Sequence, residues 1–220
     1  REKEALMFYP LFIELRHRRV LVVGGGVVAE RKVATLLQAE ADVTVVAPEI
    51  GPGLEKLEAS GAIRTARREF EEADLDGALL VVSATDDPDT QERVAVLARA
   101  QRILVNTVDQ PRLCDFIVPA IVRRGDVVAA ISTSGKSPSL AATLKERVEG
   151  VITNDVARAA HLLGAFRSEV HARFADPARR KEAFERIVES RILDWISELD
   201  DEAVLARMRG IIGGIVEGLE

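Results

Sequence analysis

The chain has 220 residues, a length that favours one main hydrophobic core with a smaller unit attached. Hydrophobic residues make up 47% of the sequence and charged residues 30%, which is typical of a globular protein and argues against a disordered or fibrous one. The formal net charge of -6 argues against a nucleic-acid binder, because such proteins usually carry a basic surface.

The single cysteine, Cys114, excludes an intramolecular disulfide and a cysteine cluster for metal. We interpret it as a small buried side chain, with a reactive thiol as the alternative. No stretch approaches the ~20 apolar residues needed to cross a bilayer. The charged residues 1–6 do not resemble a signal peptide. We therefore expect a cytoplasmic protein that has neither a membrane nor a nucleic acid as its partner.

From Arg19 onward, short β-branched runs alternate with helical stretches, which predicts an α/β fold with a Rossmann-type, doubly wound parallel sheet. Four runs are almost continuously apolar, as in strands buried on both faces: 20–23, 43–46, 79–83 and 103–108. A more polar run at 62–67 predicts an edge strand. Helices are predicted at 28–38, 54–60 and 88–100. We interpret residues 1–111 as one nucleotide-binding domain.

After Pro111 the alternation of strand and helix stops. Two strands are predicted at 116–122 and 126–131, joined by a polar turn at 123–125. A helix is predicted at 137–149, with Ser137 as the N-cap and Pro138 at the first helical position. Residues 112–150 therefore form a small α+β unit. Residues 151–220 are helical in pattern, with breaks near 176–177, near 200–201 and at the Gly213, Gly214 pair, and we interpret them as a helical domain.

The glycine-rich sequence from Gly24 to Ala29 matches the GxGxxG/A pattern of dinucleotide-binding loops. It follows a predicted strand and opens a predicted helix, which is the context that this pattern requires. Gly24 would permit a tight turn and Gly26 would let the backbone approach a pyrophosphate. The helix N-terminus would face the phosphates with its positive end. A sharp turn without a cofactor is the alternative.

The end of the second predicted strand bears on the choice of cofactor. Rossmann domains usually place an acid there to hold the adenosine ribose, whereas this strand ends in Ala47 and Pro48. Glu49 lies just beyond, and no arginine beside it is placed to receive a 2′-phosphate. The sequence therefore favours NAD over NADP. Small and polar residues at 83–87 end the next apolar strand, where ligands bind in open α/β sheets, with a helix cap before Pro88 as the alternative.

Several separated motifs follow one another in order. Residues 8–12 precede the glycine loop and 29–32 follow it, and then come 83–87, 106–109, 114–119 and 132–138. Together they resemble the precorrin-2 dehydrogenase family, which includes the N-terminal part of siroheme synthase. The resemblance implies NAD-dependent oxidation of precorrin-2 to sirohydrochlorin in siroheme or cobalamin biosynthesis. In some members Fe²⁺ insertion by a ferrochelatase activity follows, and the resemblance also implies a homodimer that exchanges the central unit.

The resemblance also assigns roles to individual residues. The cofactor-binding positions, with the last two as additions, fall on Gly24, Gly26, Val27, Val28, Pro48, Glu49, Ala84 and Thr85. The functional aspartate falls on Asp109, and a hydroxyl linked to substrate handling falls on Thr133 or Ser134.

The chemistry of these residues fits such a reaction. Removing two hydrogens from a macrocycle needs a hydride acceptor and a group that takes a proton, and a carboxylate is suitable. We expect Asp109 to be catalytic, with an Asx-type turn before Pro111 as the alternative. Asp115 is a second candidate, with a turn or strand edge as the alternative. For iron insertion the macrocycle would supply the ligands, so we expect no metal site, and His17, His161 and His171 lack ligand spacing.

A substrate rich in carboxylates calls for cations. Lys136 lies in a small polar loop before the capped helix, so we expect it to bind the substrate. An alternative of another class is a non-catalytic NAD-binding module that senses redox state. Asp109 and the motif at 132–138 argue against it, because a sensor has no need of them.

Overall fold

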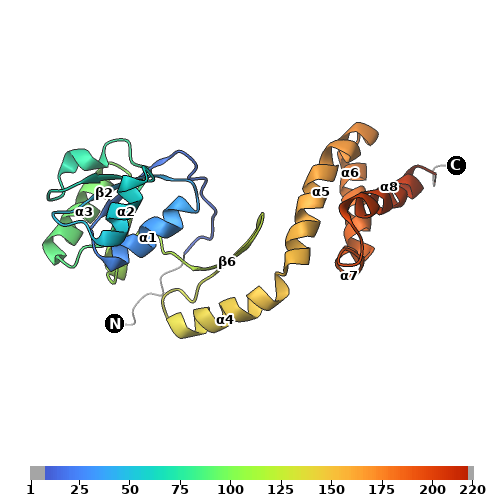
Figure 1. The fold of residues 1–220 in the computed structure, drawn as a ribbon. Helices are drawn as coiled ribbons and strands as arrows, with labels where there is room; N and C mark the ends of the chain where they lie inside the picture. Colours follow the sequence, from blue (N-terminus) through green and yellow to red (C-terminus); the bar gives the residue numbers. More distant parts are fainter. Residues whose placement is uncertain (1–7, 218–220) are drawn as a thin grey trace. The chain divides into compact units, whose positions relative to one another are not determined.

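The computed structural model describes the backbone of residues 8–217 and the side chains of residues 8–215. The chain divides into two compact units, Arg1–Val118 and Pro119–Glu220, and each is described by itself. Figure 1 shows the order of the elements along the chain, from the Rossmann-like sheet to the C-terminal helices.

The first unit contains a five-stranded parallel sheet with the order β3-β2-β1-β4-β5. Its strands are β1 (Arg19–Val23), β2 (Asp42–Val46), β3 (Arg64–Ala66), β4 (Leu80–Ser83) and β5 (Leu104–Thr107). The chain moves outward from β1 to β3 and then crosses back to β4, so the direction of winding reverses between β1 and β4. The predicted doubly wound sheet is confirmed, and β3 is the edge strand that its polar sequence predicted.

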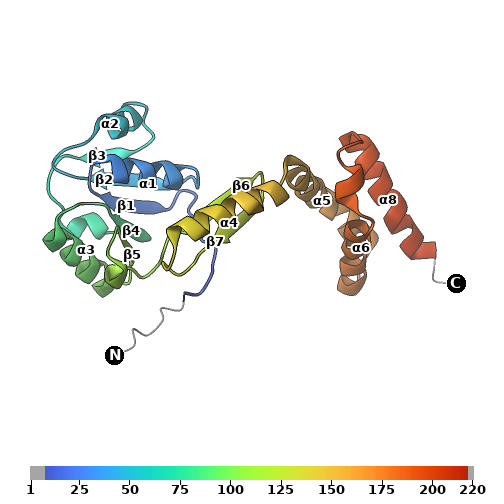
Figure 2. The same cartoon turned by 90° about the horizontal axis from the view of Figure 1, so that it is seen from below.

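Three helices cover the two faces of this sheet: α1 (Val27–Leu37), α2 (Pro52–Ala59) and α3 (Pro88–Ala100). On one face, Val33 of α1 and Leu54 of α2 pack in a buried cluster with Val22 of β1. On the other face, Val94 of α3 packs with Val81 of β4. Figure 2 shows α1 and α3 on opposite sides of the strands. Because both faces are covered, the strands had to be apolar throughout, which is why they were easy to predict.

The second unit begins with a hairpin and a helix: β6 (Ala120–Arg124), β7 (Val127–Ile131) and α4 (Pro138–Val151). The prediction that the first strand starts at residue 116 was wrong. Phe116 packs against the core of the first unit, and its carbonyl accepts a hydrogen bond from Asn106 Nδ2 at 2.9 Å. The predicted turn at 123–125 also shifts, because Arg124 pairs with Val127 and the turn is made by Gly125, with φ of 54°, and Asp126.

The rest of the second unit is helical: α5 (Asn154–Arg173), α6 (Pro177–Glu189), α7 (Ile192–Trp195) and α8 (Asp201–Glu217). The breaks predicted at 176–177 and 200–201 are confirmed. The break predicted at Gly213 and Gly214 was wrong, because α8 continues through both. Their neighbours Ile212 and Ile215 are buried in the core of this unit, and that packing outweighs the low helix propensity of glycine. An unpredicted break lies at Arg191, with φ of 62°.

The contacts also bear on the division into domains. Leu113 is buried in the core of the first unit and Asp115 N–H donates to Val105 O at 2.8 Å, so residues 112–118 lie with the sheet. Within the second unit, the buried hydrophobic cluster lies between Ala159 and Ile215, whereas no residue of α4 is buried. The proposed separation of residues 112–150 from 151–220 stays a prediction.

Among residues 8–217, no helix combines the length and the apolar character that crossing a membrane requires.

Candidate cofactor cleft and active-site loops

Close backbone contacts shape the glycine loop between β1 and α1. Gly24 has φ of 122°, a backbone conformation that residues with a side chain rarely adopt. Its N–H donates to Val46 O at 2.9 Å. A Cβ atom at Gly24 would lie 2.5 Å from the carbonyl oxygen of Ala84. Only glycine therefore fits where the ends of β1 and β4 approach each other.

Gly25 ties the loop after β2 to the glycine loop. Its carbonyl accepts a hydrogen bond from Gly51 N–H at 2.9 Å, and a Cβ atom at Gly25 would lie 1.9 Å from Glu49 O. Sequence reasoning missed Gly25 because it occupies a variable position of the GxGxxG pattern. The tight contact places Glu49 beside the loop, even though it stands beyond the end of the strand.

Gly26 differs from its two neighbours. It is the N-cap of α1 in an ordinary extended conformation, with φ of -84°, and a Cβ atom there would meet nothing within 4 Å. No side chain caps the helix, so the N–H groups of its first turn, at Val27 and Val28, are not engaged by a cap. The positive end of α1 is thus available to an anion, and a side chain at Gly26 would take up the space that the anion needs.

These residues line a cleft of about 500 Å³ at the carboxyl edge of the sheet, where the winding reverses. All eight positions predicted to bind the cofactor lie in its wall: Gly24, Gly26, Val27, Val28, Pro48, Glu49, Ala84 and Thr85. Gly25, Ala47 and Asp86 complete the lining and were not predicted. Thr85 and Asp86 precede the N-terminus of α3, which the Asp87 carboxylate caps by accepting from Thr90 N–H at 3.0 Å.

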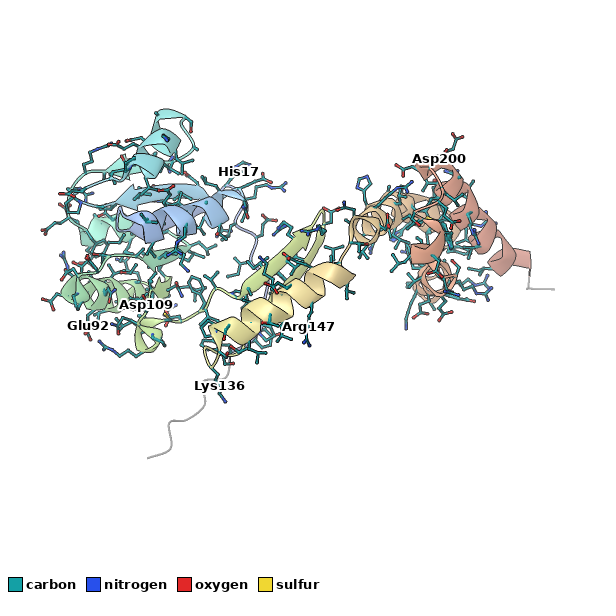
Figure 3. The ribbon with its side chains drawn as sticks, turned by 60° about the horizontal axis from the view of Figure 1, so that its bottom comes forward. His17, Glu92, Asp109, Lys136, Arg147 and Asp200 are labelled. Carbon is teal, nitrogen blue, oxygen red and sulfur yellow. The ribbon has the colours of Figure 1, made fainter. Side chains whose placement is uncertain are left out.

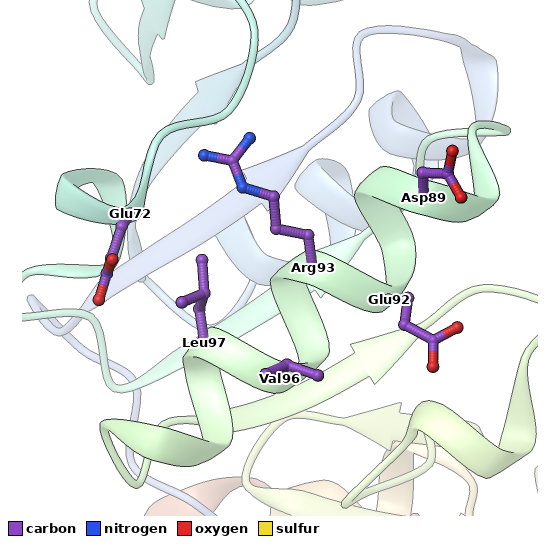
Figure 4. A pocket seen from close by; sticks show the side chains of 6 residues that line it. All are labelled: Glu72, Asp89, Glu92, Arg93, Val96 and Leu97. Atoms are coloured by element: carbon purple, nitrogen blue, oxygen red, sulfur yellow. The ribbon is translucent and has the colours of Figure 1, made fainter.

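A larger hollow of about 560 Å³ lies on the outer side of α3, and Figure 4 shows its lining. It holds Glu72, Asp89, Glu92, Arg93, Val96 and Leu97. The Arg93 guanidinium lies over the Phe70 ring, 5.5 Å from its centroid. None of the predicted site residues lies there. We therefore place the site in the smaller cleft, where helix N–H groups and close backbone contacts provide a means of binding phosphates.

Asp109 lies in the loop after β5, at the carboxyl edge of the sheet (Figure 3). It is exposed, and its φ of 57° lies in the left-handed region that a non-glycine residue adopts rarely. Its carboxylate makes no hydrogen bond to another described residue, and Pro111 has no N–H for the Asx-type turn that was the alternative. The carboxylate is therefore available to a ligand.

Asp115 has a structural role instead. Its carboxylate accepts from Arg99 Nε at 2.9 Å and from Val105 N–H at 3.2 Å, which fixes it along β5. Neighbouring Cys114 is half-buried, and burial raises the pKa of its thiol. These contacts favour a strand-edge role for Asp115 over a catalytic one. They also favour a packed side chain for Cys114 over a reactive thiol.

The predicted substrate residues lie in the second unit, in the loop between β7 and α4. The Thr133 hydroxyl accepts from Ser137 N–H and donates to Ser137 O, both at 3.0 Å, so it is engaged within the loop. Ser134 and Lys136 are exposed, and Ser134 has φ of 52°. Ser137 caps α4 as predicted by accepting from Leu140 N–H at 3.2 Å. Of the two predicted hydroxyls, that of Ser134 is the more accessible.

Within the part of the chain whose side chains are described, no three His, Cys, Asp or Glu residues are grouped so that they could hold a metal ion.

Two protein families match the chain. Residues 11–120, half of its length, match the family described as "Putative NAD(P)-binding". The chain belongs to this family. The prediction of a nicotinamide dinucleotide cofactor is thereby confirmed at the level of NAD(P). Residues 155–211 match the family described as "Sirohaem synthase dimerisation region", which covers the helices from α5 to α8.

Individual relatives agree with both matches. The siroheme synthase of Thioalkalivibrio sulfidiphilus is 43% identical over 197 residues, which cover 89% of this chain and 40% of the relative. The siroheme synthase of Methylobacillus flagellatus is 42% identical over 205 residues, which cover 93% of this chain and 44% of the relative. The chain thus spans less than half the length of these enzymes.

A solved structure named "SirC, precorrin-2 dehydrogenase" resembles most of the chain. The TM-score is 0.75 at 28% sequence identity, and the match covers 92% of this chain and 100% of that one. The resemblance inferred from the separated motifs, to precorrin-2 dehydrogenase and the N-terminal part of siroheme synthase, is confirmed.

Proposed function

We propose that the chain is an NAD-dependent precorrin-2 dehydrogenase, which oxidises precorrin-2 to sirohydrochlorin in siroheme or cobalamin biosynthesis. The observation that carries this proposal is the cleft at the carboxyl edge of the sheet, whose wall contains every residue expected to bind the cofactor. The likeness over 92% of this chain to a protein named precorrin-2 dehydrogenase supports the choice of reaction.

NAD, when bound in this cleft, supplies the hydride acceptor. The N–H groups of Val27 and Val28 at the start of α1 would bind the pyrophosphate, with Gly26 leaving room for it. Glu49 lies beside the glycine loop, to which the hydrogen bond from Gly51 N–H to Gly25 O ties its segment, and it would accept hydrogen bonds from the adenosine ribose hydroxyls and repel a 2′-phosphate. This arrangement favours NAD over NADP.

Asp109 would act as the proton acceptor at the macrocycle. Its carboxylate is exposed and unbonded to the described residues, so it is free to accept a proton from the carbon framework as the hydride leaves. The same carboxylate would accept protons from the pyrrole nitrogens, which must lose them before Fe²⁺ enters. In that reaction the macrocycle nitrogens hold the iron, so Fe²⁺ is a substrate rather than a resident cofactor.

Lys136 and Ser134 would bind the carboxylates of the macrocycle from the loop before α4, and the Thr133 hydroxyl would hold the shape of that loop through its hydrogen bonds with Ser137. The ammonium group of Lys136 is exposed there, and the start of α4 adds its positive end. We also propose a homodimer, supported by the dimerisation-region match at residues 155–211 and by the absence of buried residues on α4. The cytoplasmic location stays a prediction.

The test is to mix the purified protein with precorrin-2 and NAD under anaerobic conditions. We expect the absorbance of sirohydrochlorin and of NADH to rise together, with the two products formed in equal amounts. The Asp109→Asn variant should bind NAD and show almost no turnover. Tight NAD binding with no turnover by the native chain would favour a redox-sensing module and refute the dehydrogenase. Adding Fe²⁺ to sirohydrochlorin in a separate reaction tests the ferrochelatase step.

A further inference from the structure

The loop that carries Asp109 is closed by the side chain of Cys114. Thr107, the last residue of β5, donates its N–H to Cys114 Sγ at 3.2 Å, and the thiol donates to Thr107 O at 3.1 Å. The same sulfur lies 3.4 Å from Gln110 O, a second acceptor for its hydrogen. One side chain therefore joins the end of β5 to the residue that follows the short helix η2 (Pro111–Leu113), with Asp109 inside the closed loop.

Asn106 holds the segment that follows this closure. Its side chain is 7% exposed, and its Nδ2 donates to Phe116 O at 2.9 Å and lies 3.6 Å from Cys114 Sγ. The backbone adds a bond from Asp115 N–H to Val105 O at 2.8 Å. The chain after the loop is thus fixed along β5 by groups that make no contact with the carboxylate of Asp109.

The backbone of Asp109 needs such support. The left-handed region is uncommon for a non-glycine residue, although aspartate adopts it more often than most, and contacts on either side of Asp109 stabilise its φ of 57°. The carboxylate itself makes no bond to the described residues, so the backbone of the loop alone sets its direction. Before Asp109, Val108 N–H donates to Ser83 O at 2.9 Å. After Asp109, Gln110 N–H donates to Thr107 O at 3.4 Å, and the thiol of Cys114 adds two hydrogen bonds to the same residue.

The thiol is suited to this task in its protonated form. It accepts from one backbone N–H and donates to a backbone carbonyl, which needs both functions of an S–H group. Burial raises the pKa of the thiol, so the donor is retained at neutral pH. A methyl group at this position would lose both bonds and leave Thr107 N–H without that acceptor.

We propose that Cys114, supported by Asn106, is a positioning residue that holds the Asp109 loop in its left-handed conformation for dehydrogenation. The inference rests on the proposed function, because Cys114 acts only through Asp109. It assigns the thiol neither a redox nor a nucleophilic role.

The experiment compares Cys114→Ala with Cys114→Ser in the full chain. We expect alanine to lower kcat roughly tenfold to a hundredfold, with the affinity for NAD unchanged, since a misplaced catalytic group costs about this much. Serine keeps a donor and an acceptor, so it should restore most of the turnover. Hydrogen exchange of the backbone amides at 108–110 should be faster in the alanine variant and return toward the native rate in the serine variant.

The matched control is Asp74→Asn. Asp74 is buried, pairs with Arg68 at 2.7 Å, and lies in η1 (Glu72–Leu75), before the amino end of β4. The substitution Asp74→Asn should therefore destabilise the first unit without altering the loop that carries Asp109. Alanine and serine variants that both behave like this control would overturn the proposal, because general destabilisation would then account for the effect.

The exchange measurement separates this proposal from the proposed function. Native exchange at 108–110 in Cys114→Ala overturns the positioning role whatever the turnover is. Full turnover by Asp109→Asn refutes the catalytic assignment, whereas faster exchange that serine restores still supports the closure of the loop by Cys114. Because Cys114 is the single cysteine of the chain, its alkylation rate reports on it alone, and rapid alkylation at neutral pH would contradict a half-buried, protonated thiol.

Discussion

The sheet of the first unit and the hairpin layer of the second unit are built differently. Every residue of β4 is buried, whereas no residue of β7 is, and in β6 only Val122 is buried. The sheet has helices on both faces, while α4 packs on the hairpin with no buried residue of its own and with Leu140 half exposed. The sheet therefore completes its own core, whereas the hairpin and α4 leave apolar side chains partly exposed.

The two regions also hold their proposed site residues differently. In the first unit, close backbone contacts fix the cleft, so its shape depends on glycine and on strand geometry. In the second unit, hydrogen bonds within the loop before α4 fix Thr133, while Ser134 and Lys136 remain exposed. Cofactor binding should thus depend on the first unit alone.

Asp109→Asn is the strongest test of that difference, because it removes the proposed proton acceptor without altering the cleft. We expect turnover of precorrin-2 to fall roughly a thousandfold, as for loss of a general base. The dissociation constant for NAD, measured by calorimetric titration, should stay at the native value. Native turnover would remove Asp109 from the mechanism.

Phe166→Ala tests whether the two units have independent cores. Phe166 is fully buried in the cluster of α5 to α8, and its truncation should cost about 3–5 kcal/mol of stability in the second unit. Differential scanning calorimetry should show one transition lowered, with NAD affinity unchanged. A single transition that shifts as a whole, together with weaker NAD binding, would show that the units are coupled.

Gly26→Asp tests the open side of the cleft. A carboxylate there would repel the pyrophosphate, so NAD affinity should fall by about two orders of magnitude. Because a Cβ at Gly26 meets nothing within 4 Å, the thermal transition should change little. Gly24→Ala is the contrasting variant, since its Cβ would lie 2.5 Å from Ala84 O and should lower stability as well.

Leu140→Glu tests the incomplete core of the hairpin layer. Leu140 is 50% exposed on α4, and a charge on that surface should weaken a homodimer by roughly tenfold in affinity. Sedimentation velocity over a dilution series measures the effect. Arg147→Glu is the control on the same helix, and equal weakening by both variants would point to charge rather than apolar contact.

Glu49→Ala should have the smallest effect. Loss of hydrogen bonds to the ribose should weaken NAD binding by about fivefold, and the preference for NAD over NADP should decrease. Fluorescence titration with both cofactors measures the ratio. An unchanged ratio would show that Glu49 does not select the cofactor.

The sequence alone determined the fold class and the kind of cofactor. Buried parallel strands must be apolar along their whole length, so β1, β2, β4 and β5 were visible as runs, and the glycine loop between β1 and α1 followed from its spacing. The motifs also indicated the family, and through it the residues that line the cleft.

Only the tertiary structure decided the rest, because it depends on contacts between residues far apart in the chain. The burial of Phe116 moved the start of β6 to Ala120, and packing of Ile212 and Ile215 carried α8 through two glycines. Gly25 must be a glycine because Glu49, on another loop, lies too close for a side chain there. Cys114 has a structural role because its thiol forms hydrogen bonds with the backbone of Thr107. Local pattern cannot report such contacts, since each partner is ordinary in its own stretch of sequence.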